Sequence, residues 1–198
     1  RPVHFVMATN NISGNLLPNG DTKAPPHRLP PAQTQAIRHR EQDDAAAVIG
    51  ATVHHLGYAQ RHYWNGEQAV SLTYRPVDHD AFVRDAEQPP IVIAAQDDAA
   101  IERVADLLVS LSPAMIVTQT ITDIDPEHHA TASLVWQACQ RRADALRRAP
   151  LLFWAPGTTS MAGMIRQSFD CIVPFAESAF EAKMRMLRCH ASQMTARR

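Results

Sequence analysis

Short apolar runs alternate along this chain with segments in which apolar residues recur at helical spacing, and this alternation constrains the fold most. Runs typical of β-strands lie at residues 3–9, 52–56, 91–95, 114–118, 151–154 and 171–173. Helical patterns lie at residues 33–49, 98–111, 126–148 and 177–192. Strands joined through helices pair in parallel, because the helix returns the chain to the same edge of the sheet. We therefore predict an α/β fold with a mostly parallel sheet and helices on both of its faces.

Two long segments without such a pattern are predicted to be loops. Residues 10–31 are rich in Pro, Asn and Gly, and residues 57–90 are aromatic and irregular, with a short hairpin expected around residues 70–74. The chain contains no internal repeat and no clear domain boundary. At 198 residues it is long enough to bury a substantial core, so we expect a single domain over residues 1–198.

The composition argues against several classes of partner. Nineteen basic and twenty acidic residues give a formal charge of −1, without the basic surplus that nucleic acid or anionic lipid attracts. No apolar run approaches the roughly 18 residues of a membrane span, and no secretory signal is present. Cys139, Cys171 and Cys189 are widely spaced, which is typical of reduced thiols. We expect a soluble, cytoplasmic protein.

The segment D-P-E-H-H-A-T at residues 125–131 is the strongest candidate for a functional site. It follows a predicted strand and opens a predicted helix, the place where α/β folds bind their ligands. A catalytic zinc site needs three protein ligands and an open position for water. His128 is able to supply a neutral imidazole to a metal, and Asp125 and Glu127 are able to orient it or add charge. The segment therefore predicts part of a metal site.

The same residues also suit a purely structural role. Asp125 is a favourable N-cap, Pro126 a favourable first helical residue, and Glu127 an acidic residue in the first turn. On this interpretation the histidines are exposed first-turn residues. No glycine-rich phosphate-binding motif is present, so a nucleotide site is not expected as an alternative.

Several further motifs accompany this segment in a fixed order. They are Arg38-x-x-Glu41, Ala45–Gly50, Leu56-Gly57-Tyr58, Ser112-Pro113, the 125–131 segment, and Lys183 followed by His190-x-Ser192-Gln193. In this order and at this spacing, the set resembles the PIG-L/LmbE-like family of zinc-dependent N-acetylglucosaminyl deacetylases. That family has an R-x-x-E helix, an H-P-D-H-x-A segment that opens a later helix, and a C-terminal K…H-x-S-Q. The resemblance covers essentially the whole chain.

The resemblance implies a Rossmann-like fold and the removal of acetyl groups from amino sugars. It implies that His128 is a zinc ligand, that Glu127 stands where the family usually has Asp, and that Asp125 stands where it usually has His. It also implies that Arg38 helps to hold the substrate. An exposed ion pair between Arg38 and Glu41 is an equally good interpretation of those two residues. The Ser192-Gln193 match implies packing of the last helix.

The first motif of the family, A-H-P-D-D-E, has no counterpart in this sequence. The first predicted strand instead resembles the family's second strand, which leads into a T-x-G-E loop. Neither Asp43-Asp44 nor Asp97-Asp98 has the His-Pro that precedes the acidic pair in the family. We therefore expect that the first βα unit, which supplies the other metal ligands and the general base, is missing.

The resemblance predicts a Zn²⁺-dependent N-deacetylase in which a zinc-activated water hydrolyses the N-acetyl group of an amino-sugar conjugate. Asp125 and Glu127 are the candidate catalytic residues, Arg38 the substrate-binding residue and His128 the metal ligand. The expected partner is a small amino-sugar substrate, with no nucleic acid and no membrane span, and an oligomer is compatible with the sequence. Two alternatives stay open: a catalytically inactive LmbE-like binding or scaffold domain, and an unrelated α/β protein.

Overall fold

The computed structural model describes residues 2–13, 16, 29–65, 67–71, 88–154, 174 and 176–193. The contacts divide the chain into two compact units, one formed by Arg1–Pro89 with Ile172–Arg198 and one formed by Pro90–Cys171. We call them the first unit and the second unit. The single domain expected over residues 1–198 stays a prediction.

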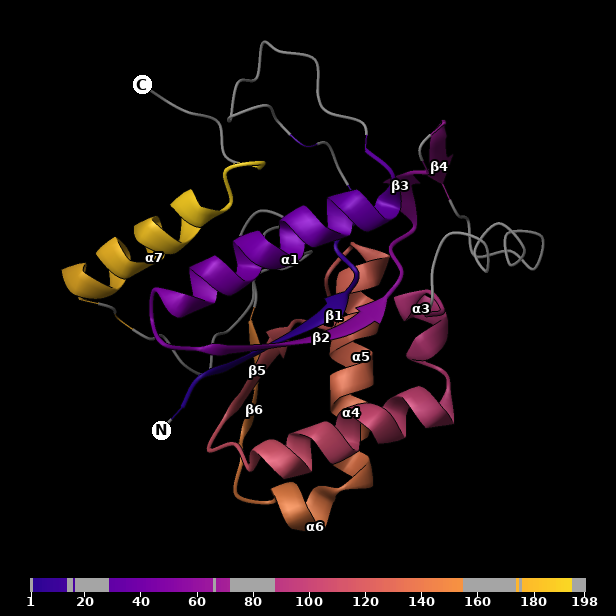
Figure 1. Cartoon of the computed structure of the whole chain (residues 1–198). Coiled ribbons are helices and arrows are strands. Elements are labelled where there is room, and N and C mark those ends of the chain that lie inside the picture. The colour runs from indigo at the N-terminus through magenta and orange to yellow at the C-terminus, as the bar shows by residue number, and fades with distance from the viewer. Residues whose placement is uncertain are drawn as a thin grey trace. The chain divides into compact units, whose positions relative to one another are not determined.

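The first unit is built on a parallel strand pair joined through a long helix (Figure 1). Strand β1 (His4–Thr9) pairs with β2 (Thr52–Tyr58), and α1 (Pro31–Ala47) lies between them in sequence. Helix α1 begins after Pro30, whose carbonyl accepts the first backbone hydrogen bonds. It ends in a turn at Gly50, where φ is +66° and glycine is favoured. Both predicted strands and the predicted helix are confirmed.

The buried face of α1 is more polar than the sequence suggested. Thr34, Arg38, Glu41 and Ala45 follow one another at helical spacing and are all buried. Ile49, at the end of the helical pattern predicted at residues 33–49, is exposed. These two buried charged residues need hydrogen-bond partners, and they find them in the first unit: Ser13 for Arg38 and Ser192 for Glu41.

A hairpin and a final helix complete the described part of the first unit. Strands β3 (His62–Trp64) and β4 (Ala69–Ser71) pair in antiparallel fashion, earlier than the hairpin predicted around residues 70–74. The turn lies where it does because the Asn65 side chain accepts the N–H groups of both Glu67 and Gln68. Helix α7 (Glu177–Cys189) lies beside α1 (Figure 1).

In its described residues, the second unit holds another parallel strand pair and four helices. Its elements in order are α3 (Ile91–Ala94), α4 (Asp98–Leu111), β5 (Ile116–Gln119), α5 (Pro126–Arg141), α6 (Ala143–Leu146) and β6 (Leu151–Trp154). Strands β5 and β6 pair from Ile116 opposite Leu151 to Gln119 opposite Trp154. Helix α5 packs against α4, α3 and β5. The predicted helix at 98–111 and the predicted strands at 114–118 and 151–154 are confirmed, and so is the α/β class with parallel pairing.

The strand predicted at residues 91–95 is wrong, because these residues form α3. The carbonyl of Pro90 accepts the N–H groups of Ile93 and Ala94, which closes a helical turn. Ile91 and Ala94 are buried while Ile93 is exposed, a spacing that suits one helix face. A short apolar run does not distinguish a strand from a buried helical turn by its pattern alone.

Two further predictions differ from the structure or lie beyond its described part. The helix predicted at 126–148 is interrupted at Arg142, whose backbone leaves the helical region and separates α5 from α6. Most of the 10–31 loop and the strand predicted at 171–173 lie outside the described residues. Within the described residues, no helix is long and apolar enough to cross a membrane.

Candidate functional site

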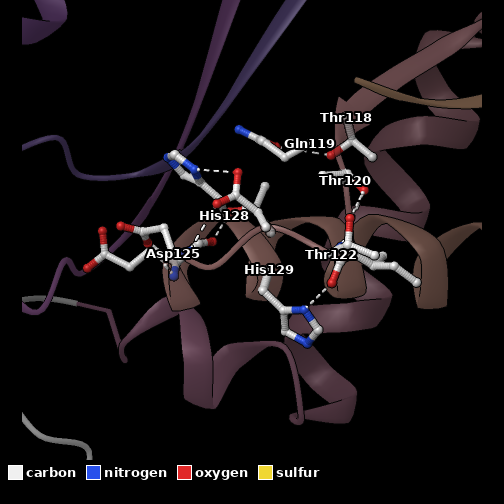
Figure 2. Close-up of polar contacts among 11 residues, drawn as sticks. Thr118, Gln119, Thr120, Thr122, Asp125, His128 and His129 are labelled. Carbon is white, nitrogen blue, oxygen red and sulfur yellow. Dashed lines mark hydrogen bonds and ion pairs between the residues drawn. The ribbon is translucent and has the colours of Figure 1, made fainter. Parts of the chain in front are cut away.

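The candidate site lies at the carboxyl end of β5, as the sequence predicted. Strand β5 ends at Gln119, a six-residue loop follows, and α5 begins at Pro126. Because β5 and β6 are parallel, their carboxyl ends meet at the same edge of the pair. Figure 2 shows polar side chains from the end of β5, from the loop and from the first turn of α5.

Asp125 caps α5. Its Oδ1 accepts a hydrogen bond of 2.8 Å from the backbone N–H of Glu127, and Pro126 occupies the first helical position. The predicted N-cap is therefore confirmed. This contact holds one carboxylate oxygen of Asp125 against the helix, and a carboxylate at this position stabilises the positive end of the helix dipole.

The loop before the cap is fixed by its own short side chains. The hydroxyls of Thr120 and Thr122 lie 3.0 Å apart, and the N–H of Asp123 donates to the carbonyl of Thr120 at 3.2 Å. The N–H of Asp125 then donates to Oδ1 of Asp123 at 2.9 Å. These bonds fix the path of the chain from β5 into α5 (Figure 2).

His128 is held by a buried carboxylate. Its Nδ1 lies 3.0 Å from Oδ2 of Asp123, whose side chain is fully buried, whereas 44% of the His128 side chain is exposed. A carboxylate that is ionised only accepts hydrogen bonds, so this contact is a hydrogen bond in the tautomer of His128 that carries its proton on Nδ1. In a neutral imidazole this leaves Nε2 with a lone pair.

His129 belongs to a different environment. Its Nδ1–H donates to the carbonyl of Ile121 at 2.6 Å, and the residue is exposed. Figure 2 shows the rings of His128 and His129 pointing away from one another, so the two imidazoles do not converge on one ligand. Of the partial metal site that the sequence predicted, the candidates that lie together are therefore His128 and the nearby acids Asp125 and Glu127, and Asp123 lies beside His128 as well.

His128 fits the role of one metal ligand. Metal-binding histidines commonly donate their other ring N–H to a carboxylate, and Asp123 provides that acceptor. Among the residues that the structure describes, no group of three His, Cys, Asp or Glu side chains is arranged to hold a metal ion. The described residues by themselves therefore do not form a complete set of metal ligands.

Arg38 and Glu41 lie in the first unit and are both buried, so the alternative of an exposed ion pair is wrong. Only 6% of Arg38 is exposed; its Nη2 donates to the carbonyl of Ser13 at 3.0 Å, and its Nε has no hydrogen-bond partner in the described structure. Burial lowers the pKa of Arg38, and the negative charge of Glu41 opposes that shift.

Glu41 binds the segment that follows α7. Its two carboxylate oxygens accept the N–H and the hydroxyl of Ser192, each at 2.7 Å. These bonds attach the end of the chain to α1 across 151 positions of sequence. The packing role expected for the Ser192 match is thus visible as a contact with the R-x-x-E helix.

Sequence reasoning missed Asp123. The sequence signal that could have found it is Asp123-Ile124-Asp125. Asp125 is the helix cap, and an Asp two residues before it is placed to accept a hydrogen bond from its backbone N–H. The four residues that it did single out divide between the units. Asp125, Glu127 and His128 lie in the second unit, and Arg38 lies in the first.

Comparison with known proteins gives a family match and several structural likenesses. The family model described as PIG-L: GlcNAc-PI de-N-acetylase matches residues 1–139. A separate comparison with curated proteins finds no match. Solved structures similar to it include the A40926 pseudoaglycone deacetylase Dbv21, with 16% identity and a TM-score of 0.54, covering 98% of this chain and 72% of that one.

Two other solved structures are similar at comparable levels. The N,N'-diacetylchitobiose deacetylase of Pyrococcus horikoshii has 14% identity and a TM-score of 0.55, covering 98% of this chain and 61% of that one. The zinc-inhibited form of teicoplanin deacetylase Orf2 has 14% identity and a TM-score of 0.56, covering 97% and 74%. At these identities the likeness shows the fold alone.

Proposed function

Because the chain belongs to the PIG-L family of GlcNAc-PI de-N-acetylases, we propose that it removes the N-acetyl group from an amino-sugar conjugate. The observation that carries this proposal is the family match over residues 1–139, which includes the R-x-x-E helix and the His128 segment. The small-molecule partner would be a conjugate that presents an N-acetylated amino sugar. The similar structures include deacetylases of the A40926 pseudoaglycone and of N,N'-diacetylchitobiose, which supports this substrate class.

We further propose that the reaction depends on zinc and that His128 is one of its ligands. The support is the Nδ1 contact of His128 with buried Asp123, which leaves Nε2 for a metal. Zinc, when bound, supplies a Lewis acid and an activated water. This sequence has no A-H-P-D-D-E motif, so His128 is the one ligand that we assign.

The other predicted site residues receive roles that follow from their surroundings. Glu127, in the first turn of α5, adds negative charge beside His128, and Asp125 stabilises the start of the helix that carries both. We assign substrate binding to Arg38, because a buried guanidinium whose Nε–H has no acceptor is able to donate to an oxygen of a bound sugar.

One observation favours the alternative of a catalytically inactive binding domain. Asp125 stands where the family usually has His, and its carboxylate is engaged in capping α5. A negative charge there repels a developing oxyanion. A cytoplasmic location and the lack of a nucleic-acid partner stay predictions of the sequence.

Acetate release tests the reaction and distinguishes the two functions. The chain would be incubated with zinc and with N-acetylglucosaminyl conjugates, and both acetate and the free amine would be measured. We expect equal amounts of the two products. Binding of a conjugate without any acetate release would contradict the enzyme and support the binding domain.

A further inference from the structure

The contacts of Asp123 divide neatly between its two carboxylate oxygens. Oδ1 accepts the backbone N–H of Asp125 at 2.9 Å, and Oδ2 lies 3.0 Å from Nδ1 of His128. The first contact belongs to the loop, whereas the second reaches into the first turn of α5. A fully buried carboxylate is costly unless both oxygens are bonded, and here both are.

We propose that Asp123 is a positioning residue that holds His128 as its Nδ1–H tautomer and so leaves Nε2 as the atom that faces a metal. The part of this proposal that concerns the metal rests on the proposed function, whereas the part that concerns the tautomer of His128 does not. Asp123 acts through His128 and touches no reacting atom in this account.

The hydrogen bonds of the loop hold the Asp123 carboxylate in its orientation toward Nδ1 of His128. Asp123 is anchored at its backbone by the carbonyl of Thr120 and at Oδ1 by Asp125, so Oδ2 has little freedom to turn away. His128 is half-exposed and lacks such anchors of its own among the contacts described. The buried partner therefore sets the orientation of the exposed one.

Replacing Asp123 by Asn gives a sharp test, because the two side chains have the same shape. The amide oxygen of the variant would keep the bond from the Asp125 N–H, and its NH₂ would then face Nδ1 of His128. An NH₂ group donates, so His128 must accept at Nδ1 and carry its proton on Nε2. Such an exchange is known to impose the wrong tautomer on a histidine that an Asp orients. Asp123→Asn thus reverses the tautomer without removing the loop contact.

The measurement is long-range ¹H–¹⁵N NMR of the histidine rings in the metal-free protein, with the His128 signals assigned by their loss in His128→Gln. The wild-type chain should show the Nδ1–H form of His128, and Asp123→Asn should show the Nε2–H form. Asp125→Asn is the matched control, since it changes the same loop and leaves both Asp123 contacts in place. It should keep the Nδ1–H form.

Titration with zinc alone then tests the metal-related part. Zinc should shift the His128 ring signals of the wild-type chain, and Asp123→Asn should weaken that binding about 10-fold or more. An Nε2–H form in the wild-type chain overturns the proposal before any variant is made. Retention of the Nδ1–H form in Asp123→Asn also overturns it.

The failure of the proposed function is distinguishable from that of the positioning role. If the tautomers behave as expected while zinc moves no His128 signal in the wild-type chain, the positioning role is supported and the metal ligand is refuted. If zinc binds both chains equally, Asp123 has no part in metal binding.

Discussion

Within the described residues, the buried guanidinium of Arg38 has one hydrogen bond, through Nη2. Its Nη2 is held by the Ser13 carbonyl, whereas its Nε–H meets no acceptor in the described structure. Glu41, one turn further on, is already bonded by Ser192. We therefore propose separable roles for the two residues of this motif, with Arg38 available to a ligand and Glu41 bonded within the fold.

Arg38→Met tests the binding role. The variant keeps much of the buried volume and removes the guanidinium, so we expect KM to rise about 10-fold, the value of one hydrogen bond to a charged group. The free energy of unfolding should fall by only about 1 kcal/mol, through loss of the bond to Ser13. Steady-state kinetics of acetate release and urea denaturation give the two quantities.

Arg40→Met is the matched control, because Arg40 is an exposed arginine on the same helix. It should change KM little and stability by less than about 0.5 kcal/mol. An unchanged KM in Arg38→Met would assign that residue to the fold alone.

Ser192→Ala tests the structural role of Glu41. It removes a hydroxyl that donates to a buried carboxylate, so we expect the free energy of unfolding to fall by about 1.5–3 kcal/mol. Ser110→Ala removes a hydroxyl from an exposed helix position and should cost less than about 0.5 kcal/mol. Equal losses in the two variants, measured by urea denaturation, would show that the Glu41 contact contributes nothing special.

At the scale of elements, β2 carries histidines that contact both of its neighbours in the first unit. His54 lies 3.0 Å from His4 of β1, between Nε2 and Nδ1, and His55 stacks on His39 of α1 with ring centroids 3.8 Å apart. Burial lowers the pKa of His39, nearby His55 lowers it further, and Asp43 opposes the shift. Burial and then His4 lower the pKa of His54. Folding therefore disfavours the protonated form of both histidines.

These shifts predict a loss of stability in acid. A histidine whose folded pKa lies below its unfolded value, near 6.5, binds its proton more readily in the unfolded chain. Its contribution is therefore complete above about pH 6.5 and is lost as the pH falls through the folded pKa. We expect the urea midpoint to decrease from pH 7 to pH 5.

His39→Phe should reduce that decrease, because phenylalanine stacks on His55 and takes up no proton. His129→Ala, a change at an exposed histidine, should leave the pH dependence as it is. Identical pH dependence in wild type and His39→Phe would remove His39 from this explanation.

Much of the order of helices and strands follows from the sequence, because the spacing of apolar residues and the capping and turn residues indicate the same elements. The helix at Asp98–Leu111 begins at an N-cap, Asp97, whose side chain accepts the N–H of Ala100. The residues at 91–95 carry no such signals, and tertiary packing of Ile91 and Ala94 decided their structure. Local chemistry was thus sufficient where it was strong and failed where only an apolar run was available.

At the scale of the whole molecule, the candidate site was predictable in its place and only partly in its contacts. Placement required only that D-P-E-H-H follow a strand, and in the structure the segment begins at the end of the loop that follows β5. The burial of Arg38 was hidden, because an R-x-x-E spacing suits an exposed helix face equally well. The hydrogen-bond partner of Arg38, Ser13, lies 25 positions away in the sequence, and that of Glu41, Ser192, lies 151 positions away. A local sequence pattern could not reveal contacts at such separations.

His128 and His129 provide the most direct measurement, because they are adjacent, alike in chemistry and different in environment. His128 is bonded to buried Asp123, whereas His129 is exposed and bonded to a backbone carbonyl. Acetate release from an N-acetylglucosaminyl conjugate in the presence of zinc would be compared in wild type, His128→Ala and His129→Ala. We predict that His128→Ala abolishes release and that His129→Ala retains it. Release that survives in His128→Ala would contradict the assignment of this histidine to the metal and, with it, the proposed site.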